Sequence, residues 1–247
     1  MQTVCLIIPC YNEEARFKGE EIFHFLREHD STGICLVNDG SSDGTIHVLE
    51  ALRSRSPDRV FVINLETNQG KAAAVREGVR LVEGMKRFGF VGYWDADLST
   101  PLSESLRLLD VFRSHSACRL AMASRVRRLG SSVERKASRH VLGRVFSTFA
   151  SIVLNLPVYD SQCGAKVFRV DVSQILFGEP FLSRWLFDVE LLARFRDHFG
   201  REETMTTIVE LPVMAWAEVG GSKLRVLQMM KVPYELLRIY FHYNLKR

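Results

Sequence analysis

Two acidic side chains in the tripeptide Asp95-Ala96-Asp97 are the sharpest chemical feature of the sequence. Carboxylates at this spacing after a strand can hold a hard cation when a tight turn brings both toward it. Mg²⁺ or Mn²⁺ typically takes one or two protein carboxylates, and substrate phosphate oxygens supply further ligands. The spacing therefore predicts a site for Mg²⁺ or Mn²⁺ beside a phosphorylated ligand.

Other nucleotide and metal signatures are absent from the sequence. A calcium loop counted from Asp95 would need glycine at its position 6 and glutamate at position 12, where the chain has Thr100 and Leu106. There is no G-x-G-x-x-G, and Gly70-Lys71 is followed by Ala72, so it is not a P-loop. EF-hand proteins, Rossmann dehydrogenases and P-loop enzymes are therefore excluded.

Polar residues follow each strand that the first hundred residues predict. Apolar runs at 4–8, 34–37, 60–65 and 90–94 alternate with helical patterns at 14–28, 45–53 and 70–83. This order predicts a parallel, doubly wound sheet, in which ligands bind beyond the carboxyl ends of the strands. These ends carry Pro9-Cys10-Tyr11-Asn12-Glu13, residues 38–45, Asn68-Gln69-Gly70-Lys71 and Asp95-Ala96-Asp97. The sequence therefore predicts a polar pocket at one edge of the sheet.

The second half of the chain has a less regular pattern. It predicts helices over 102–112 and 184–199, strands over 119–123 and 164–168, and a mobile loop over 126–138. An amphipathic helix is predicted over 141–156, and apolar positions recur near the C-terminus with a break or restart at Pro233. These C-terminal apolar positions are Leu224, Leu227, Met230, Leu237 and Phe241. Each apolar stripe has two interpretations, a core-facing surface or a surface that lies on a membrane.

Composition limits the class of protein. The 247 residues are 47% hydrophobic and 25% charged, which suits one α/β domain or two small ones and excludes a disordered chain. The five cysteines are scattered without a C-x-x-C, so we expect a reduced compartment and no structural zinc. The longest charge-free apolar stretch, 145–159, has 15 residues, fewer than the roughly 20 that span a bilayer. No targeting signal is evident, so we expect a soluble or peripheral protein.

Charge is distributed unevenly along the chain. Residues 1–50 contain nine acids and three bases, whereas 125–144 contain seven bases and one acid. The bases are Arg125, Arg127, Arg128, Arg135, Lys136, Arg139 and Arg144. Such a run is either a solvated face or a surface that meets phosphates or anionic lipid head groups. Because it lacks aromatic residues that would stack on bases, we expect no nucleic-acid partner.

The motifs together resemble a known family. The order P-C-Y-N-E-E, V-N-D-G-S-S-D-G-T, N-Q-G-K and D-A-D is similar to the family-2 glycosyltransferases of the GT-A fold. Further along, D-S-Q-C-G-A-K at 160–166, R-W-L-F-D-V-E at 184–190, Trp216 and G-S-K-L at 221–224 resemble the dolichyl-phosphate β-glucosyltransferase branch. The dolichyl-phosphate mannose synthases are a slightly poorer match. The resemblance covers nearly the whole chain.

The resemblance implies a role for each matching position. The donor nucleotide would be bound by Pro9, Tyr11, Asn12, Glu13, Asp39, Gly70, Lys71, Asp95 and Ala96. Asp95 and Asp97 would hold Mg²⁺ or Mn²⁺, with Asp97 the surer ligand, and the catalytic residues would be Asp97, Arg125 and Asp188. The acceptor phosphate would meet Arg125, Arg139, Gln162, Gly164 and Lys166. The alternative for Asp39 and Asp43 is to stabilise turns and helix N-termini.

Two departures from the family pattern bear on the substrates. Mannose synthases commonly have glutamine where this chain has Ser99, which disfavours a mannosyl donor. The Glu-Asp dipeptide that supplies a general base in many relatives is absent. A phosphate monoester has a second pKa of about 6, so at pH 7 it is already a nucleophilic dianion and needs no base. The missing dipeptide therefore favours a phosphate acceptor. Asp188 and Glu190 remain candidate bases, and the alternative is that they pair with Arg184 or Arg194.

We therefore expect an α/β protein of the GT-A fold, with a mostly parallel twisted sheet flanked by helices and amphipathic helices at the C-terminus. A single domain over 1–247 would have a nucleotide-sugar half (1–100), an acceptor half (101–222) and a C-terminal amphipathic helix (223–247). The expected activity is inverting, metal-dependent transfer of a hexose, from UDP-glucose or secondly GDP-mannose, to a polyprenyl (dolichyl-type) phosphate. The chain would act at the cytoplasmic face of a membrane. The alternatives are transfer to a hydroxyl group with Asp188 as base, and a non-catalytic nucleotide-sugar-binding protein.

Overall fold

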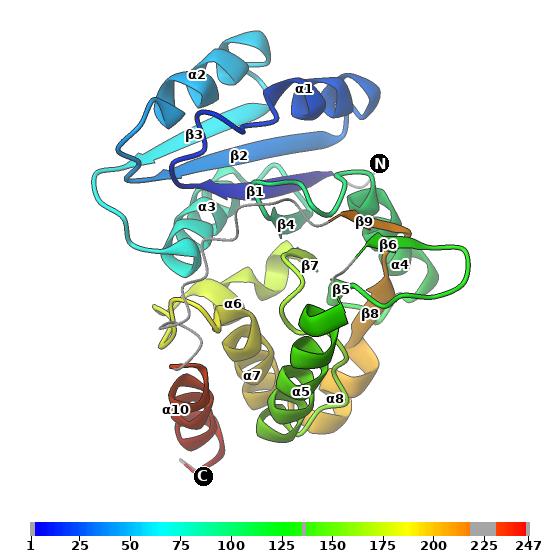
Figure 1. The fold of residues 1–247 in the computed structure, drawn as a ribbon. Helices are drawn as coiled ribbons and strands as arrows, with labels where there is room; N and C mark the ends of the chain where they lie inside the picture. Colours follow the sequence, from blue (N-terminus) through cyan, green and yellow to red (C-terminus); the bar gives the residue numbers. More distant parts are fainter. Residues whose placement is uncertain (1–2, 135–136, 218–230, 246–247) are drawn as a thin grey trace.

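The computed structural model describes residues 3–134, 137–217 and 231–245, with the side chains of 134 and 137–142 left aside. In these residues a seven-stranded sheet has helices on both faces (Figure 1). Its strands, in spatial order, are β3 (Val60–Leu65), β2 (Thr32–Asp39), β1 (Val4–Cys10), β4 (Phe90–Trp94), β7 (Ala165–Arg169), β5 (Leu120–Ser124) and β8 (Ile208–Pro212). Of these, β3 and β4 have the predicted bounds, and β8 was not predicted.

Most neighbouring strands run parallel, as the alternation of strands and helices predicts. Strand β1 pairs in parallel with β2 and β4, β2 pairs in parallel with β3, and β5 pairs in parallel with β8. Strand β7 runs antiparallel between β4 and β5. The carboxyl ends of β1, β2, β3, β4 and β5 therefore meet at one edge, where β7 begins. The predicted α/β class with a mostly parallel sheet is confirmed.

The central strands are apolar on both faces because helices cover both. Along β1, Cys5 and Ile7 belong to one hydrophobic core, and Leu6 and Ile8 belong to the other. All four side chains are fully buried. This two-sided burial explains why the strand is a continuous hydrophobic run without alternation.

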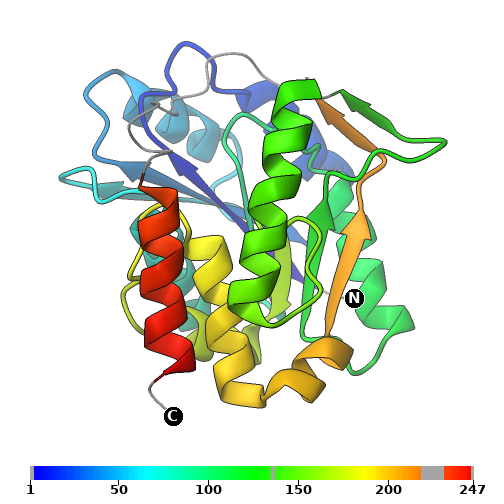
Figure 2. The same cartoon turned by 60° about the horizontal axis from the view of Figure 1, so that its bottom comes forward.

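The helices divide between the two faces. Helices α1 (Gly19–Glu28), α2 (Thr45–Arg55) and α4 (Glu104–Ser114) contribute to one core. The other core receives side chains from α3 (Lys71–Met85), α5 (Ala137–Leu154), α6 (Ser173–Phe177), α7 (Phe187–Phe199) and α10 (Val232–Asn244). A 3₁₀ turn, η1 (Val170–Val172), precedes α6, and α8 (Arg201–Thr207) follows α7. Figure 2 shows α5 in green, α7 in yellow and α10 in red on the same side of the sheet.

Two helices begin three or more residues later than the sequence pattern predicts, because local polar groups form turns first. Helix α1 begins at Gly19 rather than at residue 14, since the carbonyl oxygen of Glu13 accepts the N–H groups of Arg16 and Phe17 in a turn. Helix α7 begins at Phe187 rather than at residue 184. There the hydroxyl of Ser183 accepts the backbone N–H groups of residues 185 and 186.

The loop predicted over 126–138 is partly a strand. Strand β6 (Ser132–Glu134) pairs with β9 (Ala215–Ala217) in a separate two-stranded sheet. This pairing joins segments about eighty residues apart, so the local sequence pattern carries no sign of it. Near the C-terminus, the restart at Pro233 is confirmed, because α10 has this proline in its first turn. The apolar positions at 224, 227 and 230 lie outside the described residues.

The two amphipathic helices expose apolar side chains on their outer surfaces. Helix α10 packs Leu236 and Ile239 against the core, whereas Tyr234, Leu237, Phe241 and Leu245 are exposed. Helix α5 likewise buries Ala150 and Leu154 and exposes Val145, Phe149 and Ile152. The helices are adjacent, and Nδ2 of Asn244 donates a hydrogen bond of 3.2 Å to the carbonyl oxygen of Val153. We call these seven exposed side chains the apolar face. None of the described helices has the length and apolar character needed to cross a bilayer.

Candidate active site

The Asp95-Ala96-Asp97 segment forms a tight turn directly after β4. The carbonyl oxygen of Asp95 accepts the N–H of Leu98 at 3.1 Å, and Leu98 has a positive φ of 49°. Oδ1 of Asp97 accepts the backbone N–H of Ser99 at 2.9 Å, which orients this carboxylate. Ala96 is half-buried and packs against the core beneath the turn. Both acidic side chains therefore stand at the edge of the sheet where the predicted pocket lies.

Lys71 lies next to Asp95. Its Nζ is 2.5 Å from Oδ1 of Asp95 and 5.4 Å from the centre of the Phe187 ring. Burial lowers the pKa of Lys71, but the charges of Asp95, Asp188 and Asp97 and the hydrogen bond to Asp95 together outweigh this effect, and the pKa is raised. Gly70, directly before α3, has φ of 93°, a conformation that a side chain rarely adopts. The predicted donor residues Gly70, Lys71 and Asp95 are thus brought together.

Asp39, at the end of β2, holds the loop that leads into α3. Its Oδ1 accepts the N–H of Gln69 at 2.8 Å, and its Oδ2 accepts the N–H of Gly70 at 2.9 Å. The side chain of Asn68 donates to Oδ2 as well, at 3.1 Å. Asp39 is buried, so the structure gives it the turn-stabilising role that was its alternative interpretation. The role predicted for it at the nucleoside stays a prediction.

The loop after β1 is bonded to the loop after β2. The backbone N–H of Asn12 donates to Oγ of Ser41 at 3.0 Å, and Oδ1 of Asn12 accepts the N–H of Ser42 at 2.9 Å. The N–H of Glu13 donates to Oγ1 of Thr45 at 2.8 Å. Pro9 is the last residue but one of β1, Tyr11 is exposed directly after this strand, and Glu13 is buried against Arg16. Asp43 accepts the N–H of Thr45 at 3.0 Å and so stabilises the turn that precedes α2, although the N-cap itself is Gly44.

Arg125 follows β5 and forms a bidentate ion pair with Asp160. Its Nε and Nη2 each lie 2.7 Å from a carboxylate oxygen of Asp160. Burial by itself raises the pKa of Asp160. The charge and hydrogen bonds of Arg125 have a larger effect in the opposite direction, so the pKa is lowered to about 2. Burial lowers the pKa of Arg125, and Asp160 more than compensates, so that this pKa is raised. The pair is therefore fully charged over the whole physiological range.

The loop 160–164 connects Arg125 to the Asp95 turn. At its end, the carbonyl oxygen of Gly164 accepts the N–H of Asp95 at 3.0 Å. A Cβ at Gly164 would lie 2.0 Å from Oδ2 of Asp95, so only glycine allows this close approach. Glu210 holds the start of the loop, because its carboxylate accepts the N–H groups of Tyr159 and Asp160 at 2.8 and 2.6 Å. The loop thus brings the predicted acceptor and donor residues to the same place.

Lys166 and Asp188 form a buried ion pair beneath this loop. Nζ of Lys166 lies 2.5 Å from Oδ1 of Asp188 and donates to the carbonyl oxygens of Ser161 and Cys163. Lys166 is 0% exposed and Asp188 is 2% exposed. Asp188 thus pairs as its alternative interpretation expected, although with Lys166 instead of an arginine. Glu190 does pair with Arg194, at 2.8 Å.

Two buried nitrogen atoms near the loop lack a partner among the described residues. They are Nε2 of Gln162 and Nη1 of Arg144. The guanidinium carbon of Arg144 lies 3.8 Å from the ring centre of Tyr159, which precedes Asp160. Buried donors are usually satisfied, so unpaired ones next to an Arg-lined edge indicate a place for an anion. Arg139 lies in the first turn of α5, and its side chain is outside the described residues.

Asp95 and Asp97 suit a hard divalent cation. The described residues contain no group of three or more His, Cys, Asp or Glu side chains that could hold a metal ion. Two carboxylates at a turn instead fit Mg²⁺ or Mn²⁺, whose other ligands are substrate phosphates and waters. Because Asp95 is already paired with Lys71, Asp97 is the more available of the two.

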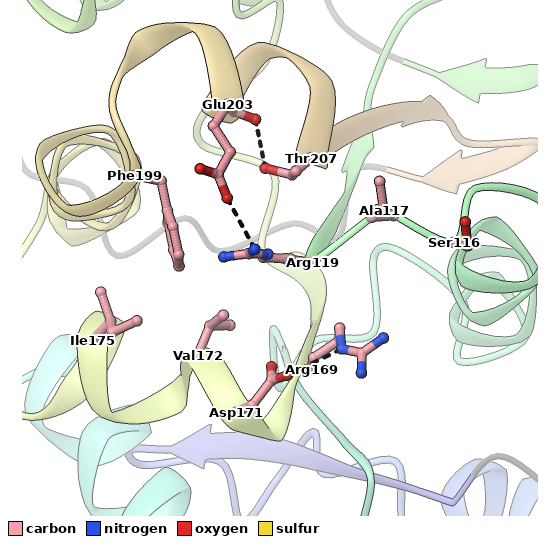
Figure 3. Close-up of a pocket in the computed structure, with 11 residues that line it drawn as sticks. Ser116, Ala117, Arg119, Arg169, Asp171, Val172, Ile175, Phe199, Glu203 and Thr207 are labelled. Carbon is pink, nitrogen blue, oxygen red and sulfur yellow. Dashed lines mark hydrogen bonds and ion pairs between the residues drawn. The ribbon is translucent and has the colours of Figure 1, made fainter.

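A separate cavity of about 620 Å³ lies at the opposite edge of the sheet (Figure 3). It is near the amino end of β5 and the carboxyl end of the antiparallel β7, where Arg119 and Arg169 line it. Arg119 pairs with Glu203 at 2.9 Å, and Arg169 pairs with Asp171 at 3.3 Å. None of the predicted site residues lines this cavity.

Comparisons with known proteins agree with this geometry. The model of the family described as Glycosyl transferase family 2 matches residues 5–177. This chain is a family-2 glycosyltransferase. It is 30% identical to a dolichyl-phosphate beta-glucosyltransferase of Trichomonas vaginalis over 98% of this chain and 74% of the relative. It is 32% identical to the dolichyl-phosphate beta-glucosyltransferase of Mus musculus, over 89% and 68%.

Solved structures support the fold of this glycosyltransferase. Glucosyl-3-phosphoglycerate synthase from Mycobacterium tuberculosis has a TM-score of 0.68 and 15% identity, over 98% of this chain and 80% of that one. Mannosyl-3-phosphoglycerate synthase from Rubrobacter xylanophilus has a TM-score of 0.66 and 17% identity, over 98% and 73%. The mycobacterial synthase has been crystallised with Mn²⁺, UDP and glucosyl-3-phosphoglycerate. The expected GT-A fold is confirmed.

Sequence reasoning left several residues of the glycosyltransferase without a role. Asp160 stood in a quoted motif, but its pairing with Arg125 spans 35 residues and has no local signal. Tyr93 donates its hydroxyl hydrogen to Asp188 and looks in the sequence like an ordinary strand residue. Arg144 appeared only as a member of the basic run, and Glu210 had no signal at all.

Proposed function

We propose that this glycosyltransferase transfers a hexose, with inversion, from a nucleotide-diphosphate sugar to a dolichyl-type polyprenyl phosphate. UDP-glucose is the favoured donor, and GDP-mannose is the second candidate. The observation that carries the proposal is the pair of buried, unpartnered donors on Gln162 and Arg144, near the loop that fixes Arg125. Such donors favour an anionic acceptor. The relatives named as dolichyl-phosphate beta-glucosyltransferases support the same acceptor and sugar.

The reaction is a single displacement at the anomeric carbon. An oxygen of the acceptor phosphate forms a bond to this carbon while the bond to the nucleotide diphosphate breaks, and UDP leaves with the electron pair. Arg125, held in one plane by Asp160, and Lys71 stabilise the negative charge that develops on the diphosphate. Asp97, with Asp95 nearby, would hold Mg²⁺ or Mn²⁺, which would supply Lewis-acid stabilisation of the same diphosphate.

A phosphate acceptor needs no protein base, whereas a hydroxyl acceptor does. The candidate base, Asp188, is buried and accepts hydrogen bonds from Lys166 and Tyr93. A carboxylate in this environment has no access to an acceptor hydroxyl. Its placement therefore favours the phosphate acceptor over the alternative of transfer to a glycan or small-molecule hydroxyl.

The donor side of the proposal rests on the loops after β1, β2 and β3. Pro9, Tyr11, Asn12, Glu13 and Asp39 stand at the carboxyl edge, where the nucleoside would bind. UDP is preferred because the relatives are glucosyltransferases by name and because a neighbour of the same fold binds UDP with Mn²⁺. In this assignment, residues 1–100 bind the donor and 101–222 bind the acceptor.

We further propose that the chain meets its acceptor at a membrane surface, on the cytoplasmic face. The apolar face of α5 and α10 exposes Phe149 and Phe241 by 57% and 54%. Arg238 on α10 and Lys231, directly before this helix, are exposed as well. Exposed aromatic and aliphatic side chains beside cations suit an anionic lipid surface, which a lipid-linked phosphate requires. The protein would then be peripheral.

The test is release of nucleoside diphosphate from a donor panel with Mn²⁺ or Mg²⁺. A polyprenyl phosphate is compared with the matched polyprenol, which has the same chain and no phosphate. We expect UDP release from UDP-glucose only with the phosphate, and a glucosylated lipid as the product. Transfer to the polyprenol or to a free sugar would contradict the phosphate acceptor, and donor binding without any transfer would contradict catalysis.

A further inference from the structure

Lys166 has an unusual environment for a lysine. It lies within β7, its side chain is fully buried, and each of its three N–H donors has an acceptor. Nζ donates to the carbonyl oxygen of Ser161 at 2.9 Å, to that of Cys163 at 2.8 Å and to Oδ1 of Asp188 at 2.5 Å. An ammonium group has no further donor to offer. Lys166 therefore has nothing left for the acceptor phosphate to which the sequence assigned it.

The two carbonyl groups that Lys166 binds belong to the loop 160–164. Asp160 at the start of this loop fixes Arg125, and Gly164 at its end accepts the N–H of Asp95. One ammonium group thus holds the middle of a loop whose ends contact the predicted leaving-group cation and the predicted metal-binding turn. A shift of this loop would move Arg125 and Asp95 together.

Asp188 fixes the same ammonium from the other side. It lies in the first turn of α7, and Tyr93 donates a hydrogen bond to the Oδ1 atom that Lys166 contacts. Tyr93 stands opposite Lys166 in the pairing of β4 with β7, two residues before Asp95. Asp188 is therefore tied to β4 close to the turn that carries Asp95.

We propose that Lys166 and Asp188 act as a buried ion pair that positions Arg125 and Asp95 for the transfer. Lys166 is a positioning residue rather than an acceptor-phosphate ligand, and Asp188 is its counter-ion rather than a general base. The inference rests on the proposed function and concerns how that same site is assembled. It also decides between two interpretations of Asp188, a general base and a member of an ion pair, which the sequence alone does not separate.

A double-mutant cycle separates these roles, because an unpaired buried charge is more harmful than a neutral pair. We compare Lys166→Met, Asp188→Asn and the double variant by UDP release, by Mn²⁺–UDP affinity and by thermal unfolding. We expect Lys166→Met to lower kcat about tenfold or more, and the double variant to recover about fivefold or more of that loss. Lys18→Met, which breaks an exposed pair with Glu21, is the matched control and should change nothing.

The double variant keeps the test decisive if Lys166→Met does not fold. Asp188→Asn leaves the buried ammonium group of Lys166 without its counter-ion, whereas the double variant contains no buried charge at either position. We therefore expect the double variant to have a higher kcat than Asp188→Asn. A double variant no more active than Asp188→Asn would assign Asp188 as the base and overturn the proposal.

Two further outcomes are informative. If Lys166→Met raises only the KM for the polyprenyl phosphate, with kcat and thermal midpoint unchanged, Lys166 is a phosphate ligand and the proposal is wrong. If the wild-type chain transfers nothing to the polyprenyl phosphate, the proposed function fails by itself. Mn²⁺–UDP affinity and the unfolding midpoints of the variants then still measure the coupling energy between Lys166 and Asp188. A coupling energy of zero by both measures overturns the ion-pair inference.

Discussion

Arg125 donates two hydrogen bonds of 2.7 Å to the two carboxylate oxygens of Asp160, and its backbone N–H donates a third of 3.0 Å to the same group. A bidentate pair fixes the plane of the guanidinium as well as its position. The direction in which Arg125 presents its outer N–H groups is therefore set by a residue that lies 35 positions away in the chain. The position of Arg125, the cation that we propose at the leaving group, depends on the loop before β7 as much as on β5.

This pair gives the folded protein a defined response to acid. The pKa of Asp160 is about 2 in the folded protein, against about 3.9 in an unfolded chain. The stabilisation is therefore present above pH about 4 and is lost as pH falls toward about 2. We expect Asp160→Asn to lower the free energy of unfolding by about 3 kcal/mol at pH 7 and to flatten this acid limb. Urea unfolding at a series of pH values measures both, and an unchanged acid limb would contradict the assignment.

Asp97 is the second test. Asp97→Ala removes the more available carboxylate of the predicted metal site, so we expect kcat to fall about 100-fold or more with the thermal midpoint nearly unchanged. Mn²⁺ affinity in the presence of UDP, followed by electron paramagnetic resonance, should fall in parallel. Asp58→Ala, at an exposed aspartate far from the edge, serves as the control. An active Asp97→Ala enzyme would refute the role of this residue.

Gly164 and Gly84 offer a matched pair of glycine substitutions. A methyl group at position 164 would lie 2.0 Å from Oδ2 of Asp95, whereas one at position 84, within α3, would meet nothing within 4 Å. We expect Gly164→Ala to displace Asp95 and reduce kcat about tenfold or more. Gly84→Ala should leave kcat unchanged and stabilise the helix by about 0.5–1 kcal/mol. Equal kcat values for the two variants would show that the contact with Asp95 does not matter.

Arg144 should affect the acceptor and not the donor. Arg144→Met keeps most of the side-chain stem above Tyr159 and removes the buried, unpartnered Nη1. We expect the KM for polyprenyl phosphate to rise about tenfold, with the KM for UDP-glucose unchanged. Arg113→Met, which removes an exposed arginine paired with Asp110, controls for net charge. A rise in both KM values would indicate a general structural effect instead.

The apolar face should govern binding to lipid. Phe149→Glu and Phe241→Glu place a charge on α5 and α10 where each phenylalanine is exposed. We expect each to reduce co-sedimentation with anionic vesicles about fivefold and to leave the thermal midpoint unchanged, because neither side chain packs in the core. Leu81→Glu, at a half-exposed position on α3, is the control. Unaltered vesicle binding in all three variants would disprove this surface as the contact.

Local sequence patterns predicted the strands and helices of the first half of the chain, where a single helix connects each strand to the next. The bounds of β3 and β4 were predicted correctly, since apolar runs ending in turn residues define them. The predicted start of α1 was wrong, because the turn at Glu13 competes with the helix for the same backbone groups. Such a competition is decided by contacts across the fold, which a helical period does not contain.

Lys166 shows why the site could be predicted only in part. A lysine between Ala165 and Val167 looks like the outward position of an edge strand, yet β7 lies between β4 and β5 and Lys166 is fully buried. Leu237 shows the converse, since its helical stripe left open a core-facing or an outer position and the structure exposes it. In both cases the packing partner comes from a distant segment, so the side chain's environment is a property of the assembled fold.

The position of β7 also constrains the order in which the protein is assembled during synthesis. Strands β4 and β5 do not pair with each other, and β7 must be made before the gap between them can close. Until then, the ribosome presents a nascent chain whose β4 has an open hydrogen-bonding edge, which is the kind of surface that chaperones shield and that aggregates recruit. The turn at Asp95 acquires its bond to Gly164 only at that step, so this turn stays incomplete until about the first two thirds of the chain have emerged.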